Sequence, residues 1–472
     1  MSRRRRILVL LICCMSLLIV ALDNTIVNVA LPSLGHELHA QVSGLQWTID
    51  AYTLTLASFL MLSGSTADRI GRRRTFQTGL VAFTAGSLLC SVAPSLGWLV
   101  VFRVVQALGG SMLNPVAMSI ITNTFTDRRE RAQAIGVWGG VVGISMALGP
   151  VVGGLLTDTV GWRAIFWINV PIGLAALALT WLFVPESKAA KARRADPVGQ
   201  LLVIVLLASL TYGIIEGPGA GWAVSGPCFA VAAIALAALV AYELRREEPL
   251  LDIRFFRSAP FSGAAAIAIC GFAALGSFLF LNTLYLQSNR GLSALDAGLC
   301  TLPVALMTLI FGPLSGRLVG LRGPRTSLLV AGACLTVGGV LLTRMTLTTP
   351  LPLVLSIYVI FGLGFGMVNP PITNTAVSGM PLAQAGVAAA VASTSRQIGQ
   401  SLGVAIAGAV VAGTAHGAAF VSAARAGWWI TAAYGLLVLS LAVATTGRWA
   451  AGTAERTAAR LRPLEAVGTR DG

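Results

Sequence analysis

The sequence predicts an all-α protein that crosses a membrane many times. Of its 472 residues, 56% are hydrophobic and 11% are charged, and the mean hydropathy is +0.81. Soluble domains carry about 25% charged residues. The apolar residues also gather in long runs, each of which can cross a hydrocarbon core at about 1.5 Å per residue. Together these observations exclude a soluble globular enzyme.

Fourteen apolar runs are candidate transmembrane helices. The first six extend over residues 7–31, 45–67, 75–93, 98–121, 134–156 and 163–184, and two more over 198–215 and 224–242. The last six extend over 260–286, 294–318, 326–342, 353–377, 388–411 and 428–446. We therefore predict a six-helix bundle over 1–184, a linker with two additional transmembrane helices over 185–258, a second six-helix bundle over 259–447 and a cytoplasmic tail over 448–472.

The positions of lysine and arginine predict that both ends of the chain are cytoplasmic. Of the 33 residues of these two types, 27 fall in segments that this topology places inside, four fall outside and two lie within spans. Positive residues concentrate in the cytoplasmic segments of membrane proteins. The net charge of +15 therefore reflects basic residues on the cytoplasmic side of the lipid bilayer of the cytoplasmic membrane. It does not indicate a nucleic-acid partner.

Two short motifs recur in the same order and indicate an internal repeat. Residues 64–69 (GSTADR) end the second span and 312–317 (GPLSGR) end the tenth, an offset of 248 residues. Residues 111–115 (SMLNP) lie in the fourth span and 366–370 (GMVNP) in the twelfth, an offset of 255 residues. Parallel repeats place a substrate path at their interface, near the bilayer midplane.

The turn between the second and third spans, GSTADRIGRRR over 64–74, combines glycines, one acid and four arginines. Gly64 and Gly71 allow close backbone approach, and Arg69 and Arg72 favour the cytoplasmic face. Asp68 can accept hydrogen bonds from a helix N-terminus, or pair with an arginine, in one conformation and release it in another. We predict a conformational latch. A plain stop-transfer turn is the alternative, and it needs only the arginines.

This turn resembles the signature loop of the major facilitator superfamily, Gly-x-x-x-Asp-Arg-x-Gly-Arg-Arg. The resemblance extends to motifs along nearly the whole chain, and it implies the major-facilitator fold and a transport function. Residues 22–32 (LDNTIVNVALP) and 396–403 (RQIGQSLG) are similar to stretches of the fourteen-span drug/proton antiporters of this superfamily. The resemblance thus implies a bacterial multidrug or antibiotic efflux transporter.

Polar residues within the first and fourth spans are candidates for proton coupling. Asp23 and Asn28 lie in the first span, and a carboxylate at such depth usually faces the interior of the bundle. Arg103 and Gln106 lie in the fourth span, where a buried guanidinium needs an anionic partner or several acceptors. The fourth-span motif of the resembled family implicates this arginine in proton transfer. A purely structural hydrogen bond of Asp23, or a tether from Arg103 to backbone carbonyls, remains the alternative.

Two further charged residues are candidates for the substrate path. Asp50 lies near the outer start of the second span between Trp47 and Tyr52, where it is either a cation contact or a first-turn acid favoured by the helix dipole. Arg396 lies inside the thirteenth span and is either polar lining or part of a cytoplasmic gate.

The fifth span carries glycines at spacings that allow helices to touch, and a proline that permits a kink. These residues are Gly143, Gly149, Pro150, Gly153 and Gly154. Ordinary packing could use the same pattern. The pattern resembles the antiporter motif of drug exporters, which uptake members generally lack, and it therefore favours export over import.

The sequence offers no sign of catalysis or of a cofactor. It contains no G-x-x-x-x-G-K-[ST] loop, and its seven cysteines and three histidines lack the spacings of metal or disulfide sites. We therefore predict no enzyme, no cofactor and no metal. The predicted function is proton-coupled export of hydrophobic or cationic small molecules, such as drugs and antibiotics, by a monomer that uses the proton motive force. The alternative is a proton-coupled importer of a small metabolite with the same fold.

Overall fold

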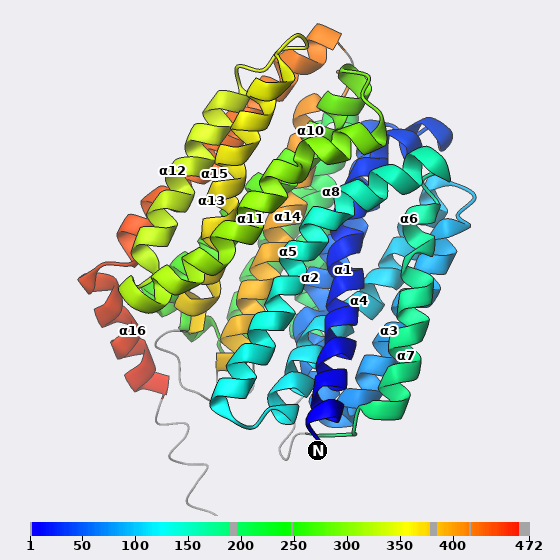
Figure 1. Cartoon of the computed structure of the whole chain (residues 1–472). Helices are drawn as coiled ribbons and strands as arrows, with labels where there is room; N and C mark the ends of the chain where they lie inside the picture. Colours follow the sequence, from blue (N-terminus) through cyan, green and yellow to red (C-terminus); the bar gives the residue numbers. More distant parts are fainter. Residues whose placement is uncertain (1, 189–195, 247–248, 378–384, 415–416, 462–472) are drawn as a thin grey trace, which may run out of the picture.

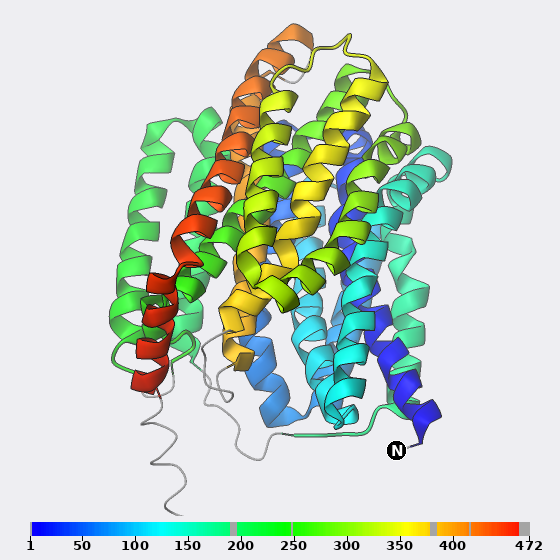
Figure 2. The same ribbon diagram turned by 60° about the vertical axis from the view of Figure 1, so that its left-hand side comes forward.

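The computed structural model describes residues 2–188, 196–246, 249–377, 385–414 and 417–461. Within these ranges the regular structure is helical, and no strand occurs in them. The N-terminus and the last helix, α16 (Arg448–Leu461), lie at the same end of the bundle (Figures 1 and 2). We call this end the terminal face and the opposite end the distal face.

The helices follow the predicted order along the chain. The first half contains α1 (Arg3–Glu37), α2 (Val42–Ile70), α3 (Arg72–Ser91), α4 (Leu96–Thr124), α5 (Arg128–Thr159), α6 (Ala164–Trp167) and α7 (Asn169–Phe183). Then come α8 (Pro197–Ala220), α9 (Trp222–Glu243) and the short η1 (Ile253–Arg257). The second half contains α10 (Ala259–Thr283), η2 (Leu284–Asn289), α11 (Ala294–Arg322), α12 (Pro324–Leu342), α13 (Leu351–Val377), α14 (Ala385–Val411) and α15 (Gly417–Thr445).

Eleven helices in the described ranges are long and apolar enough to cross a membrane. The second, third and thirteenth predicted spans coincide with α2, α3 and α14, whose many hydroxyl, amide and glycine residues lower their hydropathy. The all-helical, multi-pass architecture is therefore confirmed, whereas the count of fourteen crossings is not. Of the charges used to predict the topology, Lys191, Arg193 and Arg194 lie outside the described residues, as do residues 462–472 of the tail.

Local sequence signals set the ends of several helices. The Asp127 carboxylate accepts hydrogen bonds from the backbone N–H groups of Arg129 and Glu130 at 3.0 and 2.9 Å, and so starts α5. Gly71 ends α2 with a φ of 126°, where a Cβ atom would lie 2.6 Å from Glu186 Oε1. Only glycine fits this turn without strain.

The internal repeat is visible in the neighbours of each helix. In the first half, α1 packs against α4, α5 and α7, and α4 also packs against α2 and α3. In the second half, α10 packs against α13, α14 and α15, and α13 also packs against α11 and α12. The halves meet where α5 packs on α11 and where α2 packs on α14, which we call the seam. The additional helices α8 and α9 pack on each other, and α8 contacts both α2 and α14 at the edge of the bundle (Figure 2).

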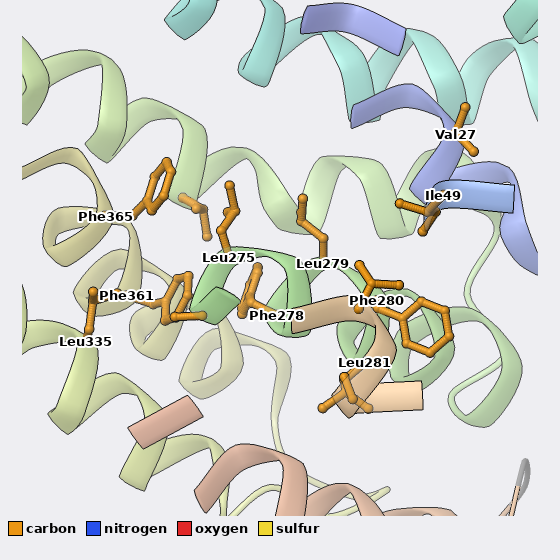
Figure 3. Close-up of a cluster of buried hydrophobic side chains, with 14 of the residues drawn as sticks. Val27, Ile49, Leu275, Phe278, Leu279, Phe280, Leu281, Leu335, Phe361 and Phe365 are labelled. Carbon is orange, nitrogen blue, oxygen red and sulfur yellow. The ribbon is translucent and has the colours of Figure 1, made fainter. Parts of the chain in front are cut away.

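The largest buried apolar cluster extends across the seam. It includes Val27 of α1 and Ile49 of α2 together with Phe278 of α10 and Phe361 of α13 (Figure 3). Burial of each such side chain contributes about 1.5–3 kcal/mol. The two halves therefore share one apolar core.

Candidate functional site

An ion pair with almost no exposed surface lies in the centre of the first half. The Asp23 side chain on α1 is 0% exposed and the Arg103 side chain on α4 is 1% exposed. Arg103 Nη1 donates to Asp23 Oδ2 at 2.5 Å. Gln106 Nε2 on α4 and Asn169 Nδ2 on α7 donate to Asp23 Oδ1 at 2.8 and 3.3 Å. Three side chains from two neighbouring helices, α4 and α7, therefore converge on the one carboxylate of α1.

The Arg103 guanidinium is held on its other sides as well. Its Nε donates to the Thr48 carbonyl on α2 at 3.0 Å, and its Nη1 also donates to Gln106 Oε1 at 2.8 Å. Its Cζ lies 4.1 Å from the centroid of the Tyr52 ring, which places it within cation–π range. The sequence left open which acid faces Arg103, and the structure places Asp23 there. The structural tether to a backbone carbonyl exists alongside this ion pair.

Close helix packing brings this cluster together. Arg103 and Gln106 are three residues apart and share one face of α4. A Cβ atom at Gly86 of α3 would lie 2.5 Å from the Gln106 backbone, so only glycine allows α3 and α4 this separation. Removing one partner of a buried ion pair costs about 3–5 kcal/mol. The loss of one charge is therefore expected to destabilise the cluster, whereas the loss of both charges together is not.

Asp50 lies at the seam and has no cationic partner among the described residues. It is 0% exposed, and Thr53 Oγ1 is 3.4 Å from its Oδ1 atom. The Ser401 hydroxyl on α14 lies near the carboxyl, but Asp50 Oδ2 forms no hydrogen bond of ordinary geometry. Asp50 is the ninth residue of α2 and therefore not a first-turn acid, and it is buried where α2 packs on α14. A contact with a cation stays a prediction.

Asn28 lies on α1 beyond the hydrogen-bonded cluster, toward the distal face. Its Nδ2 donates to the Asn24 carbonyl at 2.9 Å, and its Oδ1 is buried without a hydrogen bond. Neither Asn28 nor Asp23 has more than 2% of its surface exposed. In this conformation, therefore, neither residue borders an open path.

The predicted latch lies on the terminal face, within the first half. Asp68 Oδ1 near the end of α2 accepts from Arg72 Nη2 at the start of α3, at 3.0 Å, while Arg69 is exposed. The acid at the N-terminus of α3 is Glu186, whose carboxylate accepts from the backbone N–H groups of Arg73 and Arg74 at 3.1 and 3.3 Å. Of the two arrangements expected for Asp68, the structure therefore has the arginine pair, and Glu186 takes the place at the helix end.

Gly64, also predicted for the latch, has no atom within 4 Å of the position that a Cβ would occupy. Close approach therefore does not explain this glycine in the present conformation.

The glycines of α5 hold this helix between the two halves. Cβ atoms at Gly149 and Gly153 would lie 2.0 Å from Thr25 Oγ1 and 2.6 Å from Ile26 Cγ1 of α1. A Cβ at Gly154 would lie 2.5 Å from the backbone of α11. The motif therefore packs one face of α5 on α1 and another on α11.

Two other members of the motif lie on the same seam. A Cβ at Gly143 would lie 3.1 Å from Leu309 Cδ1 of α11. The Pro150 carbonyl lies against Gly298, where a Cβ would be 2.2 Å from it. The structure thus brings all five predicted residues to the contacts of α5 with its two neighbours.

The seam is closed toward the distal face by hydrogen bonds. Gln46 Nε2 on α2 donates to the Ala405 carbonyl of α14 at 2.7 Å. The Asp158 carboxylate at the end of α5 accepts from the backbone N–H groups of Ala294 and Leu295 at 3.1 and 2.8 Å. The first turns of α2 and α11 and the last turns of α5 and α14 are thereby fixed to one another.

The same seam is open toward the terminal face. Gly136 and Gly140 lie on the side of α5 that carries Gly143, because they precede it by seven and three residues. Among the described residues, neither has an atom within 4 Å of an added Cβ, and the same is true of Gly312 on α11. Helices α5 and α11 therefore touch at their distal ends and diverge toward the terminal face.

Arg396 lies near the middle of α14, in the second half. Its Nη1 donates to Ser393 Oγ at 3.3 Å, and its Nη2 donates to Thr373 Oγ1 of α13. It forms no ion pair within the described part of the chain. The structure therefore does not join Arg396 to Asp23, Asp50 or the latch.

Several residues of the site had no individual signal in the sequence. Asn169 is fully buried, and its Nδ2 donates to Asp23 Oδ1 and to Ser87 Oγ. Tyr52 and Thr48 contact Arg103 through a ring face and a backbone carbonyl. An amide inside an apolar run was the available signal for Asn169, whereas nothing in the sequence distinguishes the Thr48 carbonyl.

Comparison with known proteins agrees with this architecture. The sequence profile of the Major Facilitator Superfamily matches residues 13–404. The chain is 37% identical over 400 residues to the multidrug resistance protein Stp of Mycobacterium tuberculosis, covering 84% of this chain and 74% of that protein. It is 35% identical over 403 residues to the tetracenomycin C resistance and export protein of Streptomyces glaucescens, with 84% and 74% covered.

A solved structure shows the likeness in fold. A partially occluded, inward-open conformation of the xylose transporter XylE from E. coli superposes with a TM-score of 0.66 at 14% identity, covering 94% of this chain and 100% of that chain. The profile match and the identity to the two resistance proteins show that the chain belongs to the Major Facilitator Superfamily and is a multi-pass membrane transporter rather than an enzyme.

Proposed function

We propose that this transporter exports hydrophobic or cationic small molecules, drugs or antibiotics among them, across the cytoplasmic membrane in exchange for protons. The observation that carries the proposal is the fully buried Asp23–Arg103 pair, because ionisable residues inside membrane-spanning helices usually mark an ion or substrate path. The names of the two resistance proteins support drugs as the substrates.

The proposed topology has fourteen membrane crossings, with both termini in the cytoplasm. It includes α2, α3 and α14 as crossings because each lies within the bundle between accepted spans. The excess of arginine on the terminal face supports a cytoplasmic location for that face. Residues 1–184 and 259–447 then form the two moving bundles of a monomer, and residues 185–258 join them through two additional helices.

Transport would proceed by alternating access between the bundles. With the terminal face in the cytoplasm, the present conformation is inward-facing, because Gln46 and Asp158 close the seam on the distal side. Rocking about the glycine contacts of α5 would open that side and close the other. Asp68 and Arg72 lie on the terminal face, which would close in the outward-facing state. Their position supports a latch that holds this face closed.

Protonation of Asp23 would couple the proton to this movement. A neutral carboxyl no longer attracts Arg103, and the amides of Gln106 and Asn169 can then change partners. Since side chains of α1, α4 and α7 meet at this carboxylate, loss of the charge changes the packing of the first bundle. Asp50 is the second candidate, because its carboxyl lies at the seam itself.

The proton gradient supplies enough energy for such coupling. Each charge that crosses the membrane contributes about 2.3 kcal/mol per 100 mV, in addition to the pH difference. Coupling between two binding sites typically amounts to about 1–3 kcal/mol. One proton per cycle is therefore sufficient if protonation and substrate binding favour opposite conformations.

Dye transport into everted membrane vesicles from an efflux-deficient host tests this proposal. With an imposed pH gradient, acid inside, vesicles with the protein should accumulate ethidium, and Asp23→Asn should abolish the accumulation. Asp296→Asn is the matched control, because this acid is exposed in the first turn of α11. Transport by Asp23→Asn at the rate of the unchanged protein would exclude Asp23 as the coupling residue.

The direction of dye movement also tests the alternative importer. An importer would take up its substrate into right-side-out vesicles or intact cells along the proton gradient. If cells that express the protein accumulate the substrate, the result would support the importer and contradict the proposed export.

A further inference from the structure

Arg396 and Arg103 are both arginines within predicted spans, but only Arg103 has an acid beside it. The Arg396 guanidinium donates to two neutral hydroxyl groups, those of Thr373 and Ser393, and its Nε is buried without a hydrogen bond. Its Cζ lies 5.9 Å from the centroid of the Phe272 ring on α10. The side chain is thus surrounded by hydroxyl groups and an aromatic ring, with no negative charge to balance it.

The second half cannot supply that charge from its own sequence. Residues 259–447 contain a single acid, Asp296, which lies in the first turn of α11 at the distal face. The segments 378–384 and 415–416, outside the described residues, contain no acid. In the first half, the acid opposite α14 is Asp50, which lies beside Ser401, five residues from Arg396 toward the distal face. An uncompensated arginine at this depth is costly and usually marks a functional site.

The position of Arg396 fits a substrate site. It is the twelfth of the 27 residues of α14 and therefore lies near the middle of the membrane, where transporters of this architecture bind substrates. Helix α14 contacts α2 of the first half, and α10, which carries Phe272, contacts α1. Thr373 is exposed, so the guanidinium can be reached from outside the protein core.

We propose that Arg396, together with Thr373, Ser393 and Phe272, binds the acidic group of an amphipathic aromatic substrate, either a carboxylate or a phenolate. Arginine binds a carboxylate through two parallel hydrogen bonds, which are stronger than its present bonds to hydroxyl groups. The partly exposed Phe272 ring, which packs edge-on against the buried Phe365 ring at 5.2 Å, offers a surface for the substrate ring.

This inference rests on the proposed transport function and narrows its substrate class. A fixed positive charge at the path repels cationic compounds and favours compounds that carry an acid. The inference therefore narrows the hydrophobic or cationic substrates of the proposed function to amphipathic compounds with an anionic group. Under this inference, fluorescein rather than ethidium accumulates in the everted vesicles.

Two dyes that share the xanthene ring but differ in charge test the inference. Fluorescein is anionic and rhodamine 6G is cationic, and fluorescence anisotropy measures their binding to the purified full-length protein in phosphatidylcholine nanodiscs without any gradient. We expect fluorescein to bind and rhodamine 6G not to displace it. Arg396→Gln should weaken the affinity for fluorescein at least about tenfold, which corresponds to about 1.4 kcal/mol. Arg396→Lys should weaken it less, because the charge remains.

Arg425→Gln is the matched control, because Arg425 is an exposed arginine of the same half on α15. It should leave the affinity for fluorescein unchanged. Should Arg396→Gln fail to fold, Thr373→Val removes one exposed hydroxyl partner and should weaken fluorescein binding about threefold. Absence of fluorescein binding, equal binding by Arg396→Gln, or displacement by rhodamine 6G at equal concentration would each overturn the inference.

A change of lipid composition distinguishes a substrate anion from a lipid headgroup. A comparison of binding with transport shows whether the anion site or the proton-driven export is wrong. Replacing part of the phosphatidylcholine by phosphatidylglycerol tests whether a lipid headgroup is the natural anion. If this addition displaces fluorescein from the unchanged protein, the assignment to a substrate is overturned. Because binding is measured without a gradient, a protein that binds fluorescein but accumulates neither fluorescein nor ethidium in everted vesicles with an imposed pH gradient supports the anion site and contradicts proton-driven export.

Discussion

The centres of the two halves occupy equivalent places in the repeat but differ in chemistry. In the first half, Asp23 of α1 pairs with Arg103 of α4. In the second half, the corresponding helices are α10 and α13, and there the Tyr358 hydroxyl donates to Asn282 Oδ1. Tyr358 follows Arg103 by 255 residues, the offset that also relates the two Asn-Pro motifs. A charged pair in one half thus corresponds to a neutral pair in the other.

Aromatic packing surrounds the neutral pair. The Phe278 ring stacks on Phe361 with centroids 4.5 Å apart (Figure 3). The Phe278 ring also meets Tyr358 edge-on at 5.0 Å. Such pairs contribute about 0.5–1.5 kcal/mol beyond the burial of their area. The first half thus has a buried charged pair at its centre, whereas the centre of the second half is neutral and aromatic. Under the proposed function, the group that responds to protons therefore lies in the first half.

The largest effect is expected from Arg103→Met, which leaves the Asp23 carboxylate buried without its cation. The free energy of unfolding should fall by about 3–5 kcal/mol, measured by unfolding in sodium dodecyl sulfate, and pH-driven dye transport should be lost. The double variant Asp23→Leu/Arg103→Met should recover much of the stability but none of the transport. If the double variant were as unstable as the single one, the ion pair would not be the source of the loss.

Phe278→Ala should lower stability by about 3 kcal/mol, because it removes a buried ring and its stacking on Phe361. Since the change lies in the neutral half, the pH dependence of the remaining transport should match that of the unchanged protein. Dye flux at several external pH values, scaled to the amount of folded protein, measures this. A shifted pH profile would mean that the aromatic centre takes part in proton coupling.

The smallest effect is expected from Tyr358→Phe, which removes the hydroxyl that donates to Asn282. An unsatisfied buried acceptor costs about 1–3 kcal/mol, and the ring contacts with Phe278 remain. Transport should continue with an unchanged pH profile in the vesicle assay. Asn282→Leu in the same background should restore part of the stability, because both polar partners are then gone; failure to do so would point to a role for Asn282 beyond this bond.

The sequence predicted the fold better than the contacts of its site. Long apolar runs and the arginine distribution depend on local composition, and the resulting multi-pass helical architecture is confirmed. The count of fourteen crossings is not confirmed, because the polar residues of α2, α3 and α14 lower the mean hydropathy of these helices. Hydropathy is a property of one segment and does not include the packing of neighbouring helices. The roles of Asp23, Asp50, Arg396 and the latch stay predictions, although the structure shows their surroundings.

The sequence by itself determined where the helices lie and which polar residues must be buried in them, because hydrophobic length and charge placement are properties of each segment alone. Only the tertiary structure decided that Asp23 faces Arg103, that Glu186 rather than Asp68 accepts from the N-terminus of α3, and that Arg396 has no acid beside it. The pairs Asp23–Arg103 and Glu186–Arg73 join residues 80 and 113 positions apart. They depend on how closely and at what rotation the helices pack, which no single segment encodes.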